Sequence, residues 1–176
     1  MKTLLILPLF FLTQISHADT LISLSKALEL HKALYSDSCD LLADLPIEPD
    51  LVTLSPKTDL IFIPCMLGAY QGSHMGYIVK KNQAPQVISV LAYDSSDEVK
   101  GLVASQDLVG YDFDPDTGVL STYSKGRGLG DCGQSSKSII AENSAGYVSV
   151  KTIEIRHKNE CDLNYDTKWT IVFKQD

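Results

Sequence analysis

A glycine-rich segment from Lys125 to Gly133 constrains the fold of this 176-residue chain more than any other stretch. Its nine residues read Lys-Gly-Arg-Gly-Leu-Gly-Asp-Cys-Gly, so four are glycines and one, Cys132, is a cysteine. Glycine can adopt positive φ angles and lets another group approach the backbone closely. The cysteine can attach the segment covalently to a distant part of the chain. We therefore expect a tightly turned segment, held in place by Cys132.

The first eighteen residues have the parts of a secretory signal peptide. Lys2 forms a basic start, an apolar run extends from Leu4 to Ile15, and Ser16-His17-Ala18 supplies small residues for a cleavage site. The run is shorter than the roughly 20 residues of a membrane-spanning helix. We expect cleavage after Ala18, no stable membrane anchor, and a periplasmic or secreted protein. Residues 19–176 would then form a single disulfide-tied β-rich domain.

Four cysteines remain after this cleavage, at Cys39, Cys65, Cys132 and Cys161. In the oxidising compartment that an exported chain enters, two disulfides are expected. Three pairings are possible. We favour Cys39 with Cys65 and Cys132 with Cys161, because each pair closes a loop of about 30 residues. A zinc site would need close ligand pairs such as C-x-x-C, which the sequence lacks.

The chain is acidic, and this limits the partners it can have. It carries 15 Lys and Arg against 22 Asp and Glu, and loss of Lys2 with the signal would give 14 − 22 = −8. Such a balance, without a basic run, argues against nucleic acid and anionic membranes as partners. A basic partner would suit it better.

The hydrophobic pattern predicts a mainly β fold, an antiparallel sandwich or small barrel with one N-terminal helix. Helical spacing of apolar residues follows Ser23, a residue that can cap a helix, and places His31 at the boundary of the apolar face. The proline-rich stretch 46–56 predicts a loop or a short edge strand. Strands are predicted within 60–63, 76–80, 86–92, 102–113, 119–123, 147–155 and 169–173. Asp114 to Gly118 predicts the turn of a hairpin.

Two patterns suggest ligands, but their context does not support them. Residues 128–133 spell G-x-G-x-x-G, yet the sequence shows hairpins where a dinucleotide site needs a βαβ unit. Asp112, Asp114 and Asp116 alternate like calcium ligands, but Tyr123 stands where an EF-hand loop has glutamate. We therefore expect a hairpin turn there, with no metal and no cofactor.

The candidate binding residues are Lys125, Arg127, Asp131 and His74. Backbone N–H groups of the glycine-rich segment, with Lys125 and Arg127, could bind an anion. Alternatively, the glycines only let the backbone wrap around the disulfide of Cys132, and Arg127 pairs with Asp131. A small-residue loop predicted at 72–76 would expose His74 and matter if it lies beside this segment. No catalytic residue is indicated.

Two blocks of the sequence resemble the bacterial "domain of unknown function 1176" family. One is Leu60 to Tyr77, with Ile-Pro-Cys at 63–65 and Gly-Ala-Tyr at 68–70; the other runs from Phe113 through Gly133. The chain departs from the family in having Gln71 where asparagine is usual, and Ser-Ser-Lys-Ser-Ile at 135–139 where members tend to carry tryptophans. The resemblance implies an exported bacterial protein with two disulfides, and it implies no activity, cofactor or catalytic residue.

We expect a non-enzymatic exported protein that binds an unknown protein or an anionic ligand through the surface around Lys125–Gly133. A first alternative is a lysozyme-inhibitor-like protein, because Thr122–Gly126 faintly resembles a loop motif of one inhibitor family and the negative charge suits a basic lysozyme. A second is an envelope-directed hydrolase. That activity would need His74 or His157 within reach of a carboxylate and a nucleophile.

Overall fold

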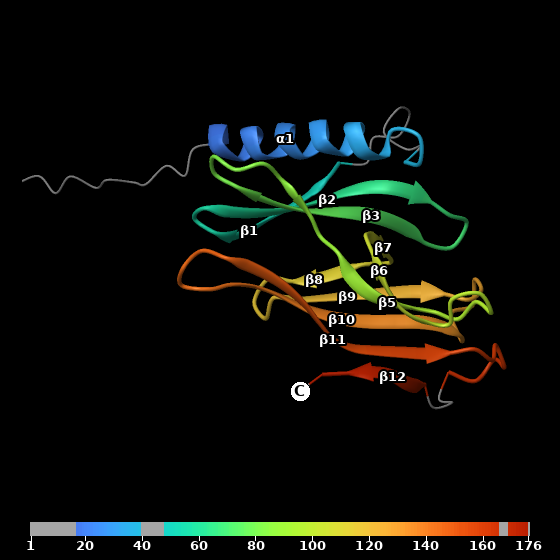
Figure 1. Cartoon of the computed structure of the whole chain (residues 1–176). Helices are drawn as coiled ribbons and strands as arrows, with labels where there is room; N and C mark the ends of the chain where they lie inside the picture. Colours follow the sequence, from blue (N-terminus) through green and yellow to red (C-terminus); the bar gives the residue numbers. More distant parts are fainter. Residues whose placement is uncertain (1–16, 40–47, 166–168, 176) are drawn as a thin grey trace, which may run out of the picture.

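The protein, described here from a computed structural model, has one helix and two five-stranded antiparallel sheets arranged in layers (Figure 1). The structure describes residues 17–39, 48–165 and 169–175. Helix α1 (His17–Tyr35) covers one face of the first sheet, and the other face of that sheet packs against the second sheet. The mainly β prediction is therefore confirmed, as a sandwich in which neither sheet closes into a barrel within the described residues.

The first sheet is built around a long hairpin. Its strands are β1 (Asp50–Ser55), β2 (Thr58–Leu67), β3 (Gly72–Lys80) and β4 (Gln86–Val87), in that order, and β7 (Asp107–Val109) also pairs with β3. Strand β2 is buried on both faces. Leu60 and Phe62 belong to the core between the sheets, while Ile61 and Ile63 belong to the core beneath α1.

Helix α1 begins at His17, so Ser23 lies inside the helix and the expectation that it caps the N-terminus is wrong. No proline or glycine interrupts the chain between these two residues. The expected cleavage site after Ala18 thus falls in the first turn of α1, and the rest of the expected signal, residues 1–16, lies outside the described residues. His31 is 1% exposed, and its Nδ1 lies 2.7 Å from the hydroxyl of Tyr77.

The second sheet has the order β12 (Thr170–Lys174), β11 (Val148–Lys158), β10 (Gly133–Glu142), β9 (Val119–Lys125) and β8 (Asp112–Asp114). The predicted hairpin is present, because β8 and β9 pair across the turn and Gly118 has a φ of +68°. Strand β10 lies at the centre of the sheet, although no pattern predicted it.

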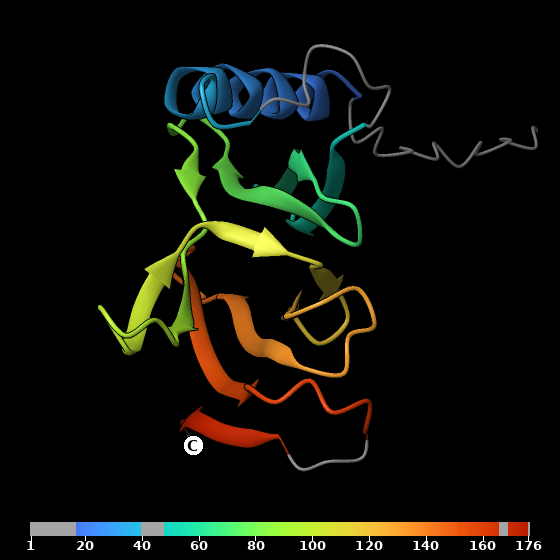
Figure 2. The same ribbon diagram turned by 90° about the vertical axis from the view of Figure 1, so that its right-hand side faces the viewer.

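A separate two-stranded ribbon, β5 (Val90–Asp94) and β6 (Gly101–Ser105), lies beside the second sheet (Figure 2). The single strand predicted over 86–92 is thus divided between β4, which pairs with β3, and β5, which pairs with β6. The predicted loop at 72–76 is also wrong: these residues open β3, which pairs with β2 on one side and β7 on the other.

Both disulfides have the predicted pairing. Cys39 is bonded to Cys65 and Cys132 to Cys161, with sequence separations of 26 and 29 residues. The first joins the residues after α1 to β2, and the second joins the glycine-rich segment to the residues after β11. They are compatible with an extracellular protein. Within the described residues, none of the helices has the length and apolar character to cross a membrane.

Candidate binding site at the glycine-rich segment

The glycine-rich segment connects β9 to β10 and folds back on itself. The N–H of Gly126 donates to the carbonyl of Cys132 at 2.9 Å, and the N–H of Gly130 donates to the carbonyl of Arg127 at 2.9 Å. Gly133 has a φ of +131°, and a Cβ there would lie 2.1 Å from the carbonyl oxygen of Ser124. Only glycine fits at this position, so the composition of the segment is needed for its close turn.

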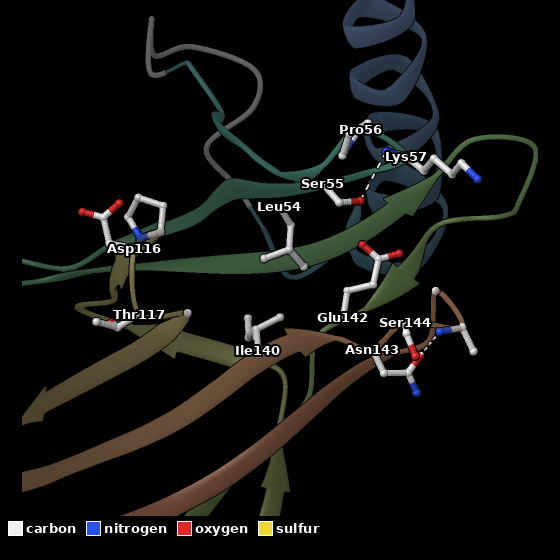
Figure 3. A pocket seen from close by; sticks show the side chains of 14 residues that line it. Leu54, Ser55, Pro56, Lys57, Asp116, Thr117, Ile140, Glu142, Asn143 and Ser144 are labelled. Atoms are coloured by element: carbon white, nitrogen blue, oxygen red, sulfur yellow. Dashed lines mark hydrogen bonds between the residues drawn. The ribbon is translucent and has the colours of Figure 1, made fainter.

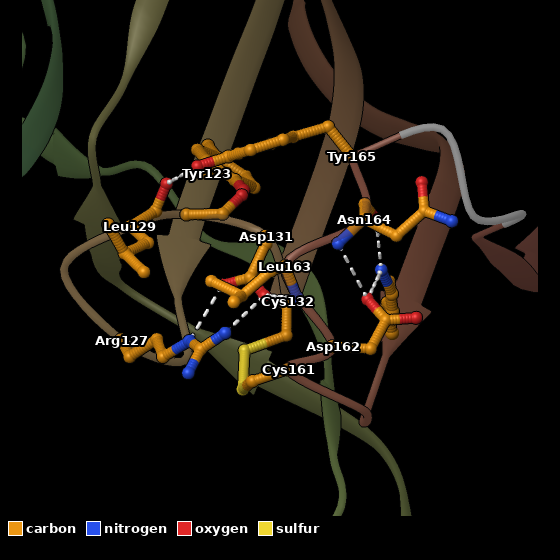
Figure 4. Close-up of a disulfide and its surroundings, with 12 residues drawn as sticks. Tyr123, Arg127, Leu129, Asp131, Cys132, Cys161, Asp162, Leu163, Asn164 and Tyr165 are labelled. Atoms are coloured by element: carbon orange, nitrogen blue, oxygen red, sulfur yellow. Dashed lines mark hydrogen bonds and ion pairs between the residues drawn. A yellow bond between two sulfur atoms is a disulfide. The ribbon is translucent and has the colours of Figure 1, made fainter.

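Arg127 and Asp131 form a two-pronged ion pair inside this turn (Figure 4). The Nε and Nη2 atoms of Arg127 donate to the two carboxylate oxygens of Asp131 at 2.8 and 2.5 Å, and the N–H of Leu163 donates to Asp131 at 2.6 Å. The hydrogen bonds from Arg127 hold the pKa of Asp131 well below its usual range. The Asp131 side chain is fully buried, whereas that of Arg127 is 38% exposed. Asp131 therefore has a structural role, as the second sequence interpretation expects.

The residues after β11 are attached to the same turn. Cys161 carries the disulfide to Cys132, and the hydroxyl of Tyr165 donates to the carbonyl of Leu129 at 3.1 Å (Figure 4). The hydroxyl of Tyr123 donates to the carbonyl of Gly130 from the β9 side. Together these contacts fix the position of the glycine-rich segment.

The turn between β2 and β3 is the third part of the site. The N–H of Lys125 donates to Oε1 of Gln71 at 2.8 Å, and the ammonium of Lys125 donates to the carbonyl of Tyr70 at 3.4 Å. The Tyr70 ring covers Gly128 so closely that a Cβ on this glycine would lie 2.7 Å from ring carbons. The two sequence blocks that carry the family resemblance therefore meet here. Their shared membership of that resemblance was the only sequence signal that could have linked Tyr70 and Gln71 to the site.

Large apolar side chains are exposed around this junction. Tyr70, Leu129, Leu163 and Tyr165 are 70%, 55%, 64% and 60% exposed, although each belongs to a segment that is held by the contacts above. Met66 and Leu67, at the end of β2, are exposed as well. We call these six residues the apolar cap. It occupies the end of the molecule where the β2–β3 turn, the β9–β10 connection and the residues after β11 lie together (Figure 1).

Of the predicted binding residues, the structure brings Lys125, Arg127 and Asp131 together but places His74 elsewhere. His74 is half-buried in β3, its ring centroid lies 4.6 Å from that of Tyr111, and burial lowers its pKa. The predicted backbone site for an anion loses three donors, because the N–H groups of Lys125, Gly126 and Gly130 donate within the protein.

The opposite end of the molecule has a hollow of about 670 Å³ between the β8–β9 and β10–β11 turns (Figure 3). Asp116 lies on its rim, but Asp114 accepts hydrogen bonds from the N–H of Asp116 and the hydroxyl of Thr117, as expected for a hairpin turn. Glu142 points into the hollow and accepts a hydrogen bond from Thr58.

Neither a metal site nor a catalytic group emerges from the described residues. Their one cluster with suitable spacing for a metal, Asp131 with Cys132 and Cys161, has both sulfur atoms in the disulfide. The three histidines outside the expected signal contact tyrosines, His31 with Tyr77, His74 with Tyr111 and His157 with Tyr93. In the part of the chain that the structure describes, none of these imidazoles hydrogen-bonds to a carboxylate.

Comparison with known proteins gives a family and no activity. Residues 13–175 match the model of DUF1176, described as a protein of unknown function. No curated protein and no solved structure matches the chain.

Proposed function

Because this chain belongs to the DUF1176 family, whose function is unknown, we propose its function from its own structure: it is an exported, non-enzymatic protein that binds a partner protein through the apolar cap. The predicted signal peptide supports the location, and the two disulfides are compatible with it. The observation that carries the proposal is the exposure of Tyr70, Leu129, Leu163 and Tyr165 around one covalently fixed turn.

Physical chemistry favours a protein partner for such a surface. Single exposed apolar residues are ordinary, but a group of them on neighbouring segments is typical of an interaction site. Tyrosine is enriched in protein interfaces because its ring supplies contact area with few rotatable bonds. The cap is also held before any partner arrives, by a disulfide, an ion pair and hydrogen bonds to backbone carbonyls. This preorganisation lowers the entropy lost on binding.

Two pairs of exposed residues allow a controlled test. Tyr165→Ser and Leu129→Ser remove cap residues, while Tyr147→Ser and Leu102→Ser remove residues of similar exposure outside the cap. The tagged exported protein would be used to capture partners from periplasm and culture medium, followed by mass spectrometry. We expect partners to be lost with the two cap variants and retained with the two controls. Partners retained by all four variants would overturn the proposal.

Lysozyme is the first partner to test directly. Thr122–Gly126, which resembles part of an inhibitor motif, leads from β9 into the segment that carries Leu129. The expected charge of −8 after cleavage would favour a basic lysozyme. Inhibition of c-, g- and i-type lysozymes should be measured at micromolar protein. If none is inhibited, the lysozyme alternative is wrong, while the capture experiment still decides the wider proposal.

A further inference from the structure

The inward face of the second sheet changes from apolar to polar toward the glycine-rich segment. Residues that pair directly across antiparallel strands share a face. Leu120, a core residue, pairs with Ser138, and the next rows on the same face are Thr122 with Ser136 and Ser124 with Gln134. Strand β11 adds His157 opposite Gln134. Burying a polar group costs free energy unless it is hydrogen-bonded, and on this face the hydroxyls of Thr122 and Ser136 bond to each other at 2.7 Å.

Part of this polar face holds the ribbon β5–β6 in place. The N–H of Leu91 donates to Oγ1 of Thr152 at 3.0 Å, and the N–H of Tyr93 donates to Oε1 of Gln134 at 2.8 Å. The bond from Tyr93 engages the amide oxygen of Gln134, and the NH₂ group of this side chain can then donate to another group. Hydrogen bonds to side chains of the polar face therefore hold the ribbon against the sheet.

Hollows remain between the ribbon and the sheet. One of about 180 Å³ is lined by Thr122, Ser124, Gln134 and Ser136 among others. A second, of about 320 Å³, shares Ser124 and Gln134 with it and reaches His157. A third, of about 350 Å³, shares Tyr93 and His157 with the second. Neighbouring hollows share lining residues, and we call the three together the polar groove.

Most groups that line the polar groove are uncharged, although Asp107, Lys125 and Glu160 line it as well. Its centre has the hydroxyl of Ser124, the amide of Gln134 and the imidazole of His157, whose ring centroid lies 5.2 Å from that of Tyr93. Lys158 also lines it, but its ammonium donates to Asp162 at 2.7 Å and to the carbonyl of Asn164 at 2.6 Å. This lysine is therefore neutralised within the protein.

We propose that the polar groove binds a neutral saccharide. A sugar presents alternating donors and acceptors, which hydroxyl, amide and imidazole groups can match. It also has an apolar ring face that can pack on an aromatic side chain such as Tyr93. Few precisely placed polar groups beside an aromatic ring are typical of small-molecule sites. None of the six cap residues lines the groove, although the glycine-rich segment borders it at Lys125 and Gly126. This inference does not rest on the proposed protein partner.

Binding would be tested by calorimetric titration of the exported protein with chitotriose, cellotriose and maltotriose. We expect at least one to bind with a Kd below about 1 mM. Ser124→Ala should weaken binding about tenfold, the effect of losing one hydrogen bond. The matched control is Ser121→Ala, on the same strand but the opposite face. It should leave the affinity unchanged.

A second measurement keeps the proposal testable if a variant folds poorly. Backbone amide chemical shifts of the unaltered protein would be followed during titration with the same sugars, and the largest changes should fall at residues 122–124, 134–136 and 157. No binding by any of the three sugars, or changes located elsewhere, would overturn the proposal. So would tighter binding of tri-alanine at the groove, since that would identify a peptide site.

Discussion

At the scale of single residues, the buried carboxylate of Asp131 explains why an arginine stands in the glycine-rich segment. Asp131 accepts hydrogen bonds from Arg127 and from the N–H of Leu163, and so connects two segments that are distant in sequence. A buried charge of this kind is tolerated only when it is paired and hydrogen-bonded. By pairing with Asp131, Arg127 therefore helps to hold the segments that carry Leu129 and Leu163 in place.

We expect Arg127→Ala to destabilise the protein and lower its Tm, because the variant leaves Asp131 buried without its main partner. Arg156→Ala is the matched control. Arg156 also bonds one carboxylate, Glu154, through two nitrogens, but that pair is more exposed. Surface pairs contribute about 0–1 kcal/mol, so the control should change the Tm little. Equal Tm values for both variants would show that Asp131 does not depend on Arg127.

Acidification should destabilise the protein in two separate ranges of pH. Burial lowers the pKa of His31 and His74 from their ordinary 6.5. Below about pH 6.5 the unfolded chain then takes up protons before the folded one does, and stability falls. The pKa of Asp131 is also lowered, by hydrogen bonds from Arg127, so its contribution is present above the ordinary 3.8 and is lost below it.

Thermal unfolding followed as a function of pH would show both declines. Asp131→Asn should remove much of the loss of Tm in the more acidic range. His31→Gln should reduce the loss of Tm that begins below the ordinary histidine pKa of 6.5. A Tm that stays constant from neutral pH down to the range of Asp131 would contradict the role of the two histidines.

At the scale of elements, strands with apolar runs were predictable and the one with polar residues was not. The 60–63 and 119–123 runs mark β2 and β9, and Asp114 to Gly118 marks the turn before β9. Strand β10 escaped prediction because Ser136 and Ser138, which are 3% and 0% exposed, occupy positions usually held by apolar residues. Their hydroxyls are satisfied by Thr122 and Thr152 on the neighbouring strands, a pairing that a single-strand pattern cannot reveal.

Ser138→Ala tests this explanation. Its hydroxyl lies 2.9 Å from that of Thr152, and we expect its loss to lower the free energy of unfolding by about 1 kcal/mol. Ser149→Ala is the control and should have little effect, because Ser149 is an exposed residue of β11 whose hydroxyl makes only a 3.4 Å hydrogen bond to the carbonyl of Ala141. Urea denaturation of the two variants and the unaltered protein gives the comparison. A stability gain in Ser138→Ala would mean that this hydroxyl pair does not stabilise the sheet.

We expect the two disulfides to contribute equally to stability but differently to partner binding, because of their positions. They close loops of similar length, with separations of 26 and 29 residues, so each should stabilise the protein by about 3.5 kcal/mol through loop entropy. Replacing Cys132 and Cys161 with alanine should also abolish capture of the partner, because the cap loses its covalent link. Replacing Cys39 and Cys65 should leave capture intact. Denaturant titration and the capture experiment would be run on both double variants; equal loss of capture would contradict this division.

At the scale of the whole molecule, the cap was beyond sequence analysis because its parts come from three separated regions. The glycine-rich segment drew attention to Lys125, Arg127 and Asp131, which do lie together. Tyr165 gave no local signal, and Tyr70 was marked only as part of the family resemblance. Tertiary contacts bring these two residues to Leu129 and Gly128. The loop predicted around His74 was wrong for a related reason, because its residues pair with β2 and β7 as part of β3.

Export can be tested on the intact molecule. If the signal is removed as expected, protein purified from the periplasm or medium begins at Asp19, which intact-mass spectrometry would show. Ala18→Pro is expected to block this cleavage, because signal peptidases need a small residue such as alanine directly before the cut. A mass that retains the first eighteen residues in the unaltered protein would contradict the proposed maturation.

The topology also has a consequence in time. The first sheet is drawn from residues 50–109 and the second from residues 112–174, so the two sheets follow each other along the chain. Chains generally fold from the N-terminus as they emerge. Helix α1 and the first sheet can therefore assemble while the second sheet is still incomplete. The cap needs Cys161, Leu163 and Tyr165, so it would be among the last features to form. A chain interrupted after the first sheet could already have the core beneath α1, and yet would lack the surface that we propose binds a partner.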